Sequence, residues 1–241
     1  MESMRPTLDQ IDALHRKYAP SQAAYELVHT HCVIVARIAR AMVRQQNHLF
    51  VTRCTRPLDD PQAPHAPARL IDANLVTAGA LLHDIGTYRV FAAGADGSTV
   101  ADLASAAAHP GALAFDRTRY ILHGLLGYEL LRSEGVDEEL ARFCRNHTGL
   151  GLTRQAVIDQ HLPLPPDDYV PDNPEQEIVM LADKYHTKNV PPQFVSPETA
   201  ARRAGRFGEE NERRQRALTE RYGVTEEALA ALAAEYGMAM I

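Results

Sequence analysis

The chain has 241 residues, of which 45% are hydrophobic and 23% are charged, and its formal net charge is −6. This is the size and composition of one large globular domain, or of one domain with an appendage, with enough apolar residues for a core. The acidic balance argues against a nucleic-acid scaffold, and three cysteines far apart in the chain argue against a disulfide framework or a structural zinc site.

The N-terminal third of the chain predicts three helices and a loop. Each helix begins at a capping residue and has apolar residues at helical spacing. The expected spans are residues 7–18, 21–46 and 72–84. Residues 47–70 contain four prolines and little periodicity, so they predict a loop insertion. The second helix carries His31 on its apolar face, and the third ends at an adjacent His83-Asp84 pair, where Gly86 is expected to terminate it.

The rest of the chain predicts a second loop insertion and more helices. Residues 92–118 show no helical pattern, and a loop of this length beside a candidate site is more often a lid or a disordered segment than core. Helices are expected over residues 119–131, 137–146 and 173–183, and three more begin at residues 153, 196 and 225. No segment predicts a strand. The expected fold is therefore all-α, with a domain over residues 1–195 and a helical extension over residues 196–241 packed on it.

Six residues with metal-ligand chemistry lie on these helices or at their ends. They are His31, His83, Asp84, His123, His147 and Asp183. The side chains of the adjacent His-Asp pair point about 100° apart on a helix, so they can serve different metals or different edges of one site. Four imidazoles and two carboxylates suit iron, manganese, nickel, cobalt or zinc. We therefore expect the six residues to converge on a two-metal site.

Simpler interpretations stand beside this one. A single histidine on an apolar helix face, such as His31, is more often a hydrogen-bonded core residue than a ligand. A buried carboxylate needs a partner, and Asp183 could pair with Arg145 or Lys184 instead of a metal. The two downstream histidines could hydrogen-bond a substrate while one metal is held. Gly127 and its neighbour at position 124 are expected to permit close helix packing.

The ordered set of histidines and aspartates resembles the HD-domain superfamily of metal-dependent phosphohydrolases, and the segment His83-Asp-Ile-Gly86 matches its HDIG variant. Two further segments, which begin at His123 and His147, are similar to glycine-containing segments of small HDIG proteins. The resemblance covers residues 21–188 and implies a helical bundle with its metal site between the central helices. It also implies the division of ligands: one metal held by His31, His83, Asp84 and Asp183, with Asp84 bridging to a second metal on His123 and His147.

The resemblance implies a hydrolase that cleaves a small phosphate ester, either a phosphomonoester or a nucleotide, with a water activated between two divalent metals. Asp84, Arg89 and Lys184 would carry the catalysis. Arg145 and Lys188 are further candidates for contact with phosphate oxygens. Cyclic-dinucleotide-cleaving relatives have a lysine directly after the HDIG segment and a downstream GYP signature. This chain has neither, which argues against that activity.

Two other functions share the same residues. A minority of the superfamily uses the same six-ligand pattern in a mixed-valent di-iron oxygenase that acts on a polyol or an organophosphonate, and residue spacing does not separate it from a hydrolase. A regulatory module could retain the fold without the chemistry, but the complete ligand set argues against this. His186, three residues after Asp183, is a candidate for supporting a ligand.

The remaining expectations concern the surface of the protein. The charged residues at 202–214 alternate in sign, so we expect a solvated face rather than a nucleic-acid patch. The segment over residues 197–221 could be a lid or a homodimer contact. No apolar signal region begins the chain, and no apolar run reaches the roughly 18 residues of a membrane span. We therefore expect a cytoplasmic protein.

Overall fold

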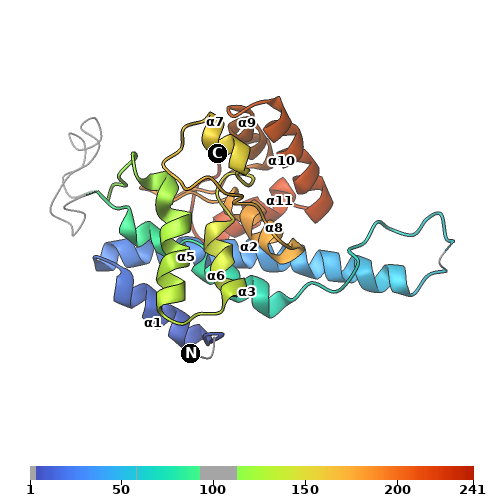
Figure 1. Cartoon of the computed structure of the whole chain (residues 1–241). Coiled ribbons are helices and arrows are strands. Elements are labelled where there is room, and N and C mark those ends of the chain that lie inside the picture. Colours follow the sequence, from blue (N-terminus) through green and yellow to red (C-terminus); the bar gives the residue numbers. More distant parts are fainter. Residues whose placement is uncertain (1–3, 58, 93–112) are drawn as a thin grey trace.

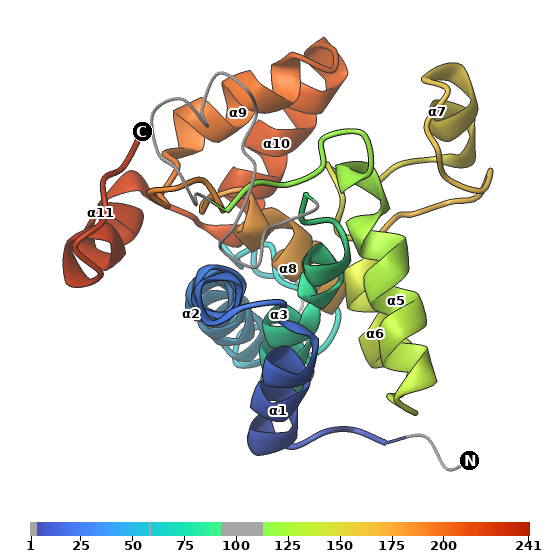
Figure 2. The ribbon, with the colours of Figure 1, turned by 90° about the vertical axis from the view of Figure 1, so that its left-hand side faces the viewer.

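The computed structural model describes residues 4–57, 59–92 and 113–241. Within these ranges the secondary structure is helical, with isolated β-bridges but no strand, so the prediction of an all-α fold is confirmed. Helix α2 runs through the molecule, and α3 and α8 lie beside it (Figure 1). Figure 2 looks along α2 and shows α5 and α6 on one side of this central group and α9 to α11 on the other.

The helices are separated by short turns over most of the chain. Their bounds are α1 Leu8–Tyr18, α2 Gln22–Cys54, α3 Ala73–Leu82, α5 His123–Ser133, α6 Glu138–Arg145, α7 Arg154–Asp159, α8 Pro174–Asp183, α9 Pro197–Gly205, α10 Glu209–Tyr222 and α11 Glu226–Glu235. Two 3₁₀ segments, η1 Ile85–Arg89 and η2 Tyr120–Leu122, lie directly before or after site residues.

The expected helix starts agree with the structure because their side chains satisfy free backbone amides. Thr7 accepts from the backbone N–H of Gln10, whose side chain accepts in return from the backbone N–H of Thr7. Asp72 accepts from two N–H groups at the start of α3, and Asn173 accepts from one at the start of α8. Each such cap stabilises its helix by about 1 kcal/mol.

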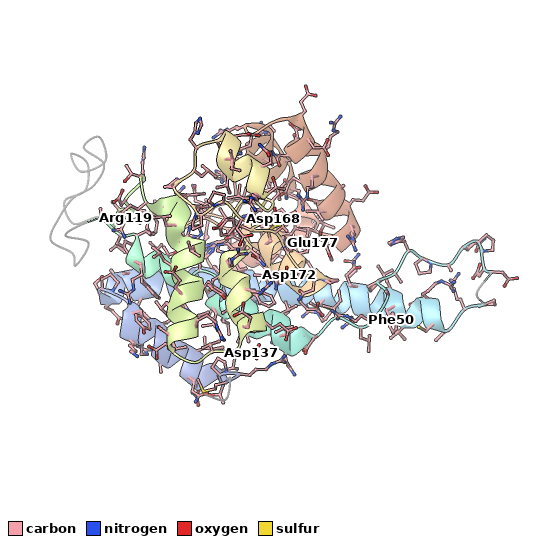
Figure 3. All side chains as sticks on the ribbon, in the orientation of Figure 1. Phe50, Arg119, Asp137, Asp168, Asp172 and Glu177 are labelled. Carbon is pink, nitrogen blue, oxygen red and sulfur yellow. The ribbon has the colours of Figure 1, made fainter. Side chains whose placement is uncertain are left out.

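Helix α2 is longer than predicted: it continues to Cys54, whereas we expected it to end near residue 46. The apolar periodicity that marks a buried face ends with Met42 and Val43, whereas the next turns protrude beyond the neighbouring helices. Figure 3 places Phe50 on this protruding part. The side chain of Asn47 hydrogen-bonds the backbone N–H and C=O of Ile71 and so fastens the start of the third helix to α2. The proline-rich loop therefore begins only after Thr55.

Two other helix ends differ from expectation. Helix α3 ends at Leu82, and Gly86 lies inside the 3₁₀ segment that follows instead of terminating α3. The charged helix that begins at Pro197 is broken in two at Gly208, whose φ of 118° disfavours other residue types. The resulting helices α9 and α10 pack against each other, and Arg216 of α10 pairs with Glu198 of α9.

The core is formed by the central helices, and α8 is buried on all sides. Residues 178–182 of α8 are fully buried, as are Ile34 and Val35 of α2. A helix that is apolar around its whole circumference belongs in the interior. The polar residue at its end, Asp183, is therefore carried into the protein, where it needs a partner.

The C-terminal helices join the same hydrophobic core through Leu218, Tyr222 and Leu229. The last residues of the chain pair with the backbone before α9, where Phe194 donates to Ala239 and Ile241 donates to Phe194. The division of the chain at residue 195 stays a prediction. None of the helices in the described ranges has the length and apolar character that crossing a bilayer requires.

Only the ends of the second loop insertion lie within the described residues. Phe91 and Phe115 form an antiparallel bridge and their rings pack together, so the two ends leave the core side by side. Residues 93–112, which include most of the expected lid or disordered segment, lie outside the described residues.

Candidate metal centre

Five helical elements carry the six candidate ligands to one place in the interior. His31 comes from α2, the His83-Asp84 pair follows α3, and Asp183 is the last residue of α8. The two remaining histidines lie at the start of α5 and directly after α6. Five of the six residues are buried and Asp183 is nearly so, with 12% of its side chain exposed.

The side chains form two groups that share Asp84. His31, His83, Asp84 and Asp183 have potential ligand atoms within 4.8 Å of one another, and so have Asp84, His123 and His147. Asp84 divides its oxygens between the groups. Its Oδ2 lies 3.4 Å from Nε2 of His31, and its Oδ1 lies 3.5 Å from Nε2 of His123. This is the arrangement in which one carboxylate can bridge two cations.

The hydrogen bonds of three histidines fix which nitrogen faces the site. Nδ1 of His83, His123 and His147 lies 2.6, 2.6 and 2.7 Å from the backbone oxygen three residues earlier in the chain. A carbonyl oxygen can only accept, so each Nδ1 carries the proton and donates it. Nε2 of each ring therefore faces the aspartates, and it presents a lone pair on that side whenever the ring is neutral.

These lone pairs lack donors. Nε2 of His83 is buried and is the one buried side-chain nitrogen or oxygen in the described part of the chain without a hydrogen-bond partner. Nε2 of His123 lies 2.9 Å from Nε2 of His147, although neither neutral ring can donate from that atom. Burying unsatisfied polar atoms is costly. A cation that accepts these lone pairs would remove the cost, so the donor set fits a metal.

The protonation states of His31, His123 and His147 agree with this fit. Burial lowers the pKa of His31 to about 4 and that of His123 to about 3, and it lowers the pKa of His147 as well. These three rings are therefore neutral at pH 7, as metal ligation requires. Burial lowers the pKa of His83 as well, but Cys32, Asp183 and Asp84 outweigh it and raise that pKa to about 10, so His83 would have to release a proton to bind a metal. Burial alone would raise the pKa of Asp84, but the nearby Lys188 and histidines hold it well below its ordinary value. The carboxylate stays ionised.

Lys188 supplies a positive charge inside the site. Its buried ammonium pairs with Oδ2 of Asp84 and lies 6.0 Å from the centre of the Tyr120 ring. The other oxygen of Asp84 accepts a 2.8 Å hydrogen bond from the Thr87 hydroxyl. Thr87 and Tyr120 were missed in the sequence interpretation, since their contacts depend on how η1 and η2 pack. The one signal for Thr87 was its place three residues after Asp84, a spacing at which side chains in a helical segment are neighbours.

The other predicted cations divide between the site and the surface. Lys184 donates to Oδ2 of Asp183 at 2.8 Å and to the backbone oxygen of His147, so it lies at the edge of the ligand cluster. Arg89 is exposed and lies over the Tyr18 ring, so the structure does not bring it to the cluster. Arg145 pairs with Asp167 and lies over the ring of Tyr169.

His186 supports His31 from behind. The two Nδ1 atoms lie 2.9 Å apart, and Nε2 of His186 faces the sulfur of Met238 at 3.4 Å. If Nε2 of His31 binds a metal, its Nδ1–H donates to His186, whose own N–H then points at Met238. A histidine ligand held in this way keeps its orientation and its tautomer.

A glycine contact brings the two groups of ligands close together. A methyl group at Gly86 would overlap the backbone oxygen of His123 and the backbone nitrogen of Gly127. The absence of side chains at both glycines therefore lets η1 approach α5. The expectation that Gly127 permits close packing is confirmed, and Gly86 has the same role.

A pocket of about 450 Å³ opens beside the cluster. Asp183, Lys184 and His186 line it from the side of the ligands, and residues 148–152, α7, α9 and α10 form its other walls. A small molecule in this pocket could reach the carboxylate and the ammonium at the end of α8.

Comparison with known proteins agrees with the fold. The family model described as HD domain matches residues 28–188, which is more than half of the chain. An uncharacterised protein of Methanocaldococcus jannaschii is 36% identical over 122 residues, which cover 50% of this chain and 54% of that protein. A tRNA (cytidine(56)-2'-O)-methyltransferase of Thermoplasma volcanium is 35% identical over 112 residues, which cover 46% of this chain and 24% of the enzyme. The chain thus matches about half or less of the length of these curated relatives.

A solved structure shares the overall fold. The HD domain of the L. monocytogenes phosphodiesterase PgpH, in complex with cyclic-di-AMP, is similar to this chain with a TM-score of 0.50 and 13% sequence identity. The similarity covers 97% of this chain and 100% of that domain. At this identity the likeness concerns the fold.

Proposed function

Because this chain belongs to the HD-domain family, whose members bind divalent metals, we propose that it is a metal-dependent phosphohydrolase that cleaves a small phosphate ester. The observation that carries the proposal is the convergence of unpaired imidazole lone pairs on a shared carboxylate. In this proposal His31, His83, Asp84 and Asp183 hold one divalent metal. His123 and His147 hold a second, with Asp84 between the two.

The metals would supply polarisation of the phosphate oxygens and a water of lowered pKa. The residues of the chain perform the other tasks. Asp84 and Asp183 provide negative charge that neutralises part of the metal charge. Lys184 lies at the boundary between the ligand cluster and the pocket, where its ammonium can contact a phosphate oxygen. Lys188 sits against Asp84, where it limits the negative charge that would repel an anionic substrate.

Arg89 has no part in this proposal, because its side chain lies over Tyr18 at the surface. Arg145 is held by the segment between α7 and α8, through Asp167 and the backbone oxygen of Asp168. The phosphate-binding cations of the proposed hydrolase are therefore the two lysines that follow α8.

The test measures phosphate release together with metal content. Protein purified without chelators is expected to contain two divalent metals per chain and to release phosphate from an aryl phosphate. His123→Gln is expected to contain about one metal fewer and to lose about a hundredfold or more in kcat, because each metal contributes several kcal/mol to transition-state stabilisation. His48→Gln replaces an exposed histidine outside the site and provides the matched control.

A second variant guards against an uninformative loss of folding. Asp84→Asn preserves the size of the side chain but removes the shared negative charge, and its folding is checked by circular dichroism. Phosphate release that persists in metal-depleted protein would refute the proposal. Two irons per chain with a mixed-valence spin signal, oxygen uptake and no phosphatase activity would refute it in favour of the di-iron oxygenase.

A further inference from the structure

The pocket beside the ligand cluster has one wall made by the C-terminal helices. Ala200, Arg203, Ala204 and Phe207 line it from α9 and the turn after it. Their spacing of three and four residues places them on one face of the helix. The two alanines have short side chains, which leaves room in the pocket beside Arg203 and Phe207. Within the charged segment that we expected to form a solvated face, Arg203 is half-buried and lines the pocket.

Arg203 brings an unmatched positive charge to this wall. It is half-buried, and burial together with the nearby Arg206 lowers its pKa from the ordinary value. No carboxylate within the described ranges hydrogen-bonds or pairs with it. By contrast, Arg216 of α10 pairs with both Glu198 and Glu212. A guanidinium that is partly dehydrated and has no anionic partner is a ready receptor for an anion.

Most of the surface that lines the pocket is apolar. Leu150 and Leu152 come from the glycine-containing segment after His147, and Phe207 comes from the turn after α9. Phe207 lines the pocket although 76% of it is exposed to solvent. The pocket thus contains two cations, Lys184 and Arg203, together with apolar side chains.

We propose, on the basis of the phosphohydrolase assignment above, that this pocket binds the organic part of the substrate and that Arg203 recognises a second anionic group on it. The substrate class is a phosphate ester of an apolar or aromatic alcohol that carries another negative charge at its far end. The scissile phosphate lies at Lys184 and the ligand cluster, and the second anion lies at Arg203. Arg203 determines specificity and takes no part in the bond cleavage.

The test compares two aryl phosphates that differ only in this second charge. Phenyl phosphate and its para-carboxylated analogue are hydrolysed by the metal-loaded full chain at pH 7, where the carboxylate is ionised. Arg203→Gln is expected to raise KM for the carboxylated ester about tenfold to a hundredfold, because hydrogen bonds between charged groups contribute that much to an equilibrium. KM for phenyl phosphate and both kcat values are expected to stay within about twofold of wild type.

Two further variants separate charge from structure. Arg202→Gln removes an arginine from the outer face of the same helix, where it hydrogen-bonds Thr199, and is expected to leave all constants unchanged. Arg203→Lys retains the charge and is expected to recover part of the lost affinity. Equal increases of KM for both substrates in Arg203→Gln, or no change in either, would overturn the proposal.

A binding measurement distinguishes failure of this proposal from failure of the phosphohydrolase assignment. Calorimetry with phenylphosphonate and its para-carboxylated analogue requires no turnover. If wild type hydrolyses neither ester but binds the carboxylated phosphonate more tightly in an Arg203-dependent way, the hydrolase assignment fails and the anion site stands. If hydrolysis occurs but neither assay shows a preference for the carboxylated probe, the hydrolase stands and the anion site is refuted.

Discussion

A single methyl group at Gly86 tests how the proposed metal centre is held together. The Cβ of Gly86→Ala would lie closer than 3.0 Å to the backbone oxygen of His123 and to the backbone nitrogen of Gly127, a separation that real Cβ atoms essentially never show. The Cα of Gly127 would be 2.7 Å away. All three obstructing atoms belong to the backbone of α5, so no side-chain rotation can relieve the contact.

The magnitude follows from the distance that must open. The Cα of Gly127 alone requires the gap between η1 and α5 to widen from 2.7 Å to the ordinary 3.4 Å, and the two closer backbone atoms require a still larger shift. Metal–ligand distances vary by only about 0.2 Å in a working site. A shift of this size therefore separates His123 from Asp84 and costs about 1–3 kcal/mol of folding free energy, as overpacking commonly does. In a chain of this length, that lowers the Tm by about 2–4 °C for each kcal/mol.

The assay combines thermal unfolding, elemental analysis and kinetics on the same preparation. Gly86→Ala is expected to fold with a lowered Tm, to bind about one metal fewer per chain, and to lose about a hundredfold in kcat. Gly127→Ala serves as the graded comparison, because its nearest neighbour would lie at 3.0 Å and its effects should be smaller. An alanine at position 86 that leaves Tm, metal content and kcat at wild-type values would refute the reasoning.

Three more predictions concern His186, Glu175 and the removal of metal. His186→Phe should weaken metal binding about tenfold to a hundredfold in a competition assay with a chromogenic chelator, because Nδ1 of His31 loses its partner, and unchanged affinity would contradict this. Burial alone would raise the pKa of Glu175, but hydrogen bonds from Arg69 and from a backbone N–H outweigh burial and lower it. Glu175→Gln should therefore reduce the free energy of unfolding by about 1–3 kcal/mol at pH 7. That stability is present above the unfolded pKa near 4.5 and is lost as pH falls through the folded pKa, so denaturant curves of variant and wild type should converge in acid; a constant difference would argue against it. Chelation of metal should lower the Tm, and added metal at about 100 times its Kd should restore about 2.7 kcal/mol, whereas a Tm that is insensitive to metal would contradict a filled site.

Local signals in the sequence predicted the helices wherever a cap coincided with an apolar pattern. Thr7, Asp72 and Asn173 each begin a helix as expected. The end of α2 was missed because periodicity reports burial, whereas the last turns of α2 are exposed and are helical without a buried face. The break at Gly208 had a visible signal in two closely spaced glycines, but a charged helical pattern on both sides concealed it.

The candidate site also has features that the sequence predicted and contacts that it did not predict. The six ordered histidines and aspartates lie together in the structure, and their role as ligands stays a prediction. The contacts of Thr87 and Lys188 with Asp84 could not be predicted, because they depend on the packing of η1 and of the turn after α8. That Arg203 lines a pocket could not be predicted either, since the residue pattern alone does not show which face of α9 borders a cavity.

The sharing of Asp84 has a consequence for the order in which the two proposed sites fill. The first group contains two carboxylates, whereas the second contains only the Oδ1 atom of a carboxylate that the first already uses. Two divalent ions would leave the centre with a surplus of positive charge, and the second ion would be held mainly by two neutral imidazoles. A phosphate dianion supplies the missing negative charge, so substrate and second metal should strengthen each other's binding by the same factor. Metal occupancy at low metal concentration would then rise with the concentration of phosphorylated compound, so the substrate would help to retain the second ion when metal is scarce.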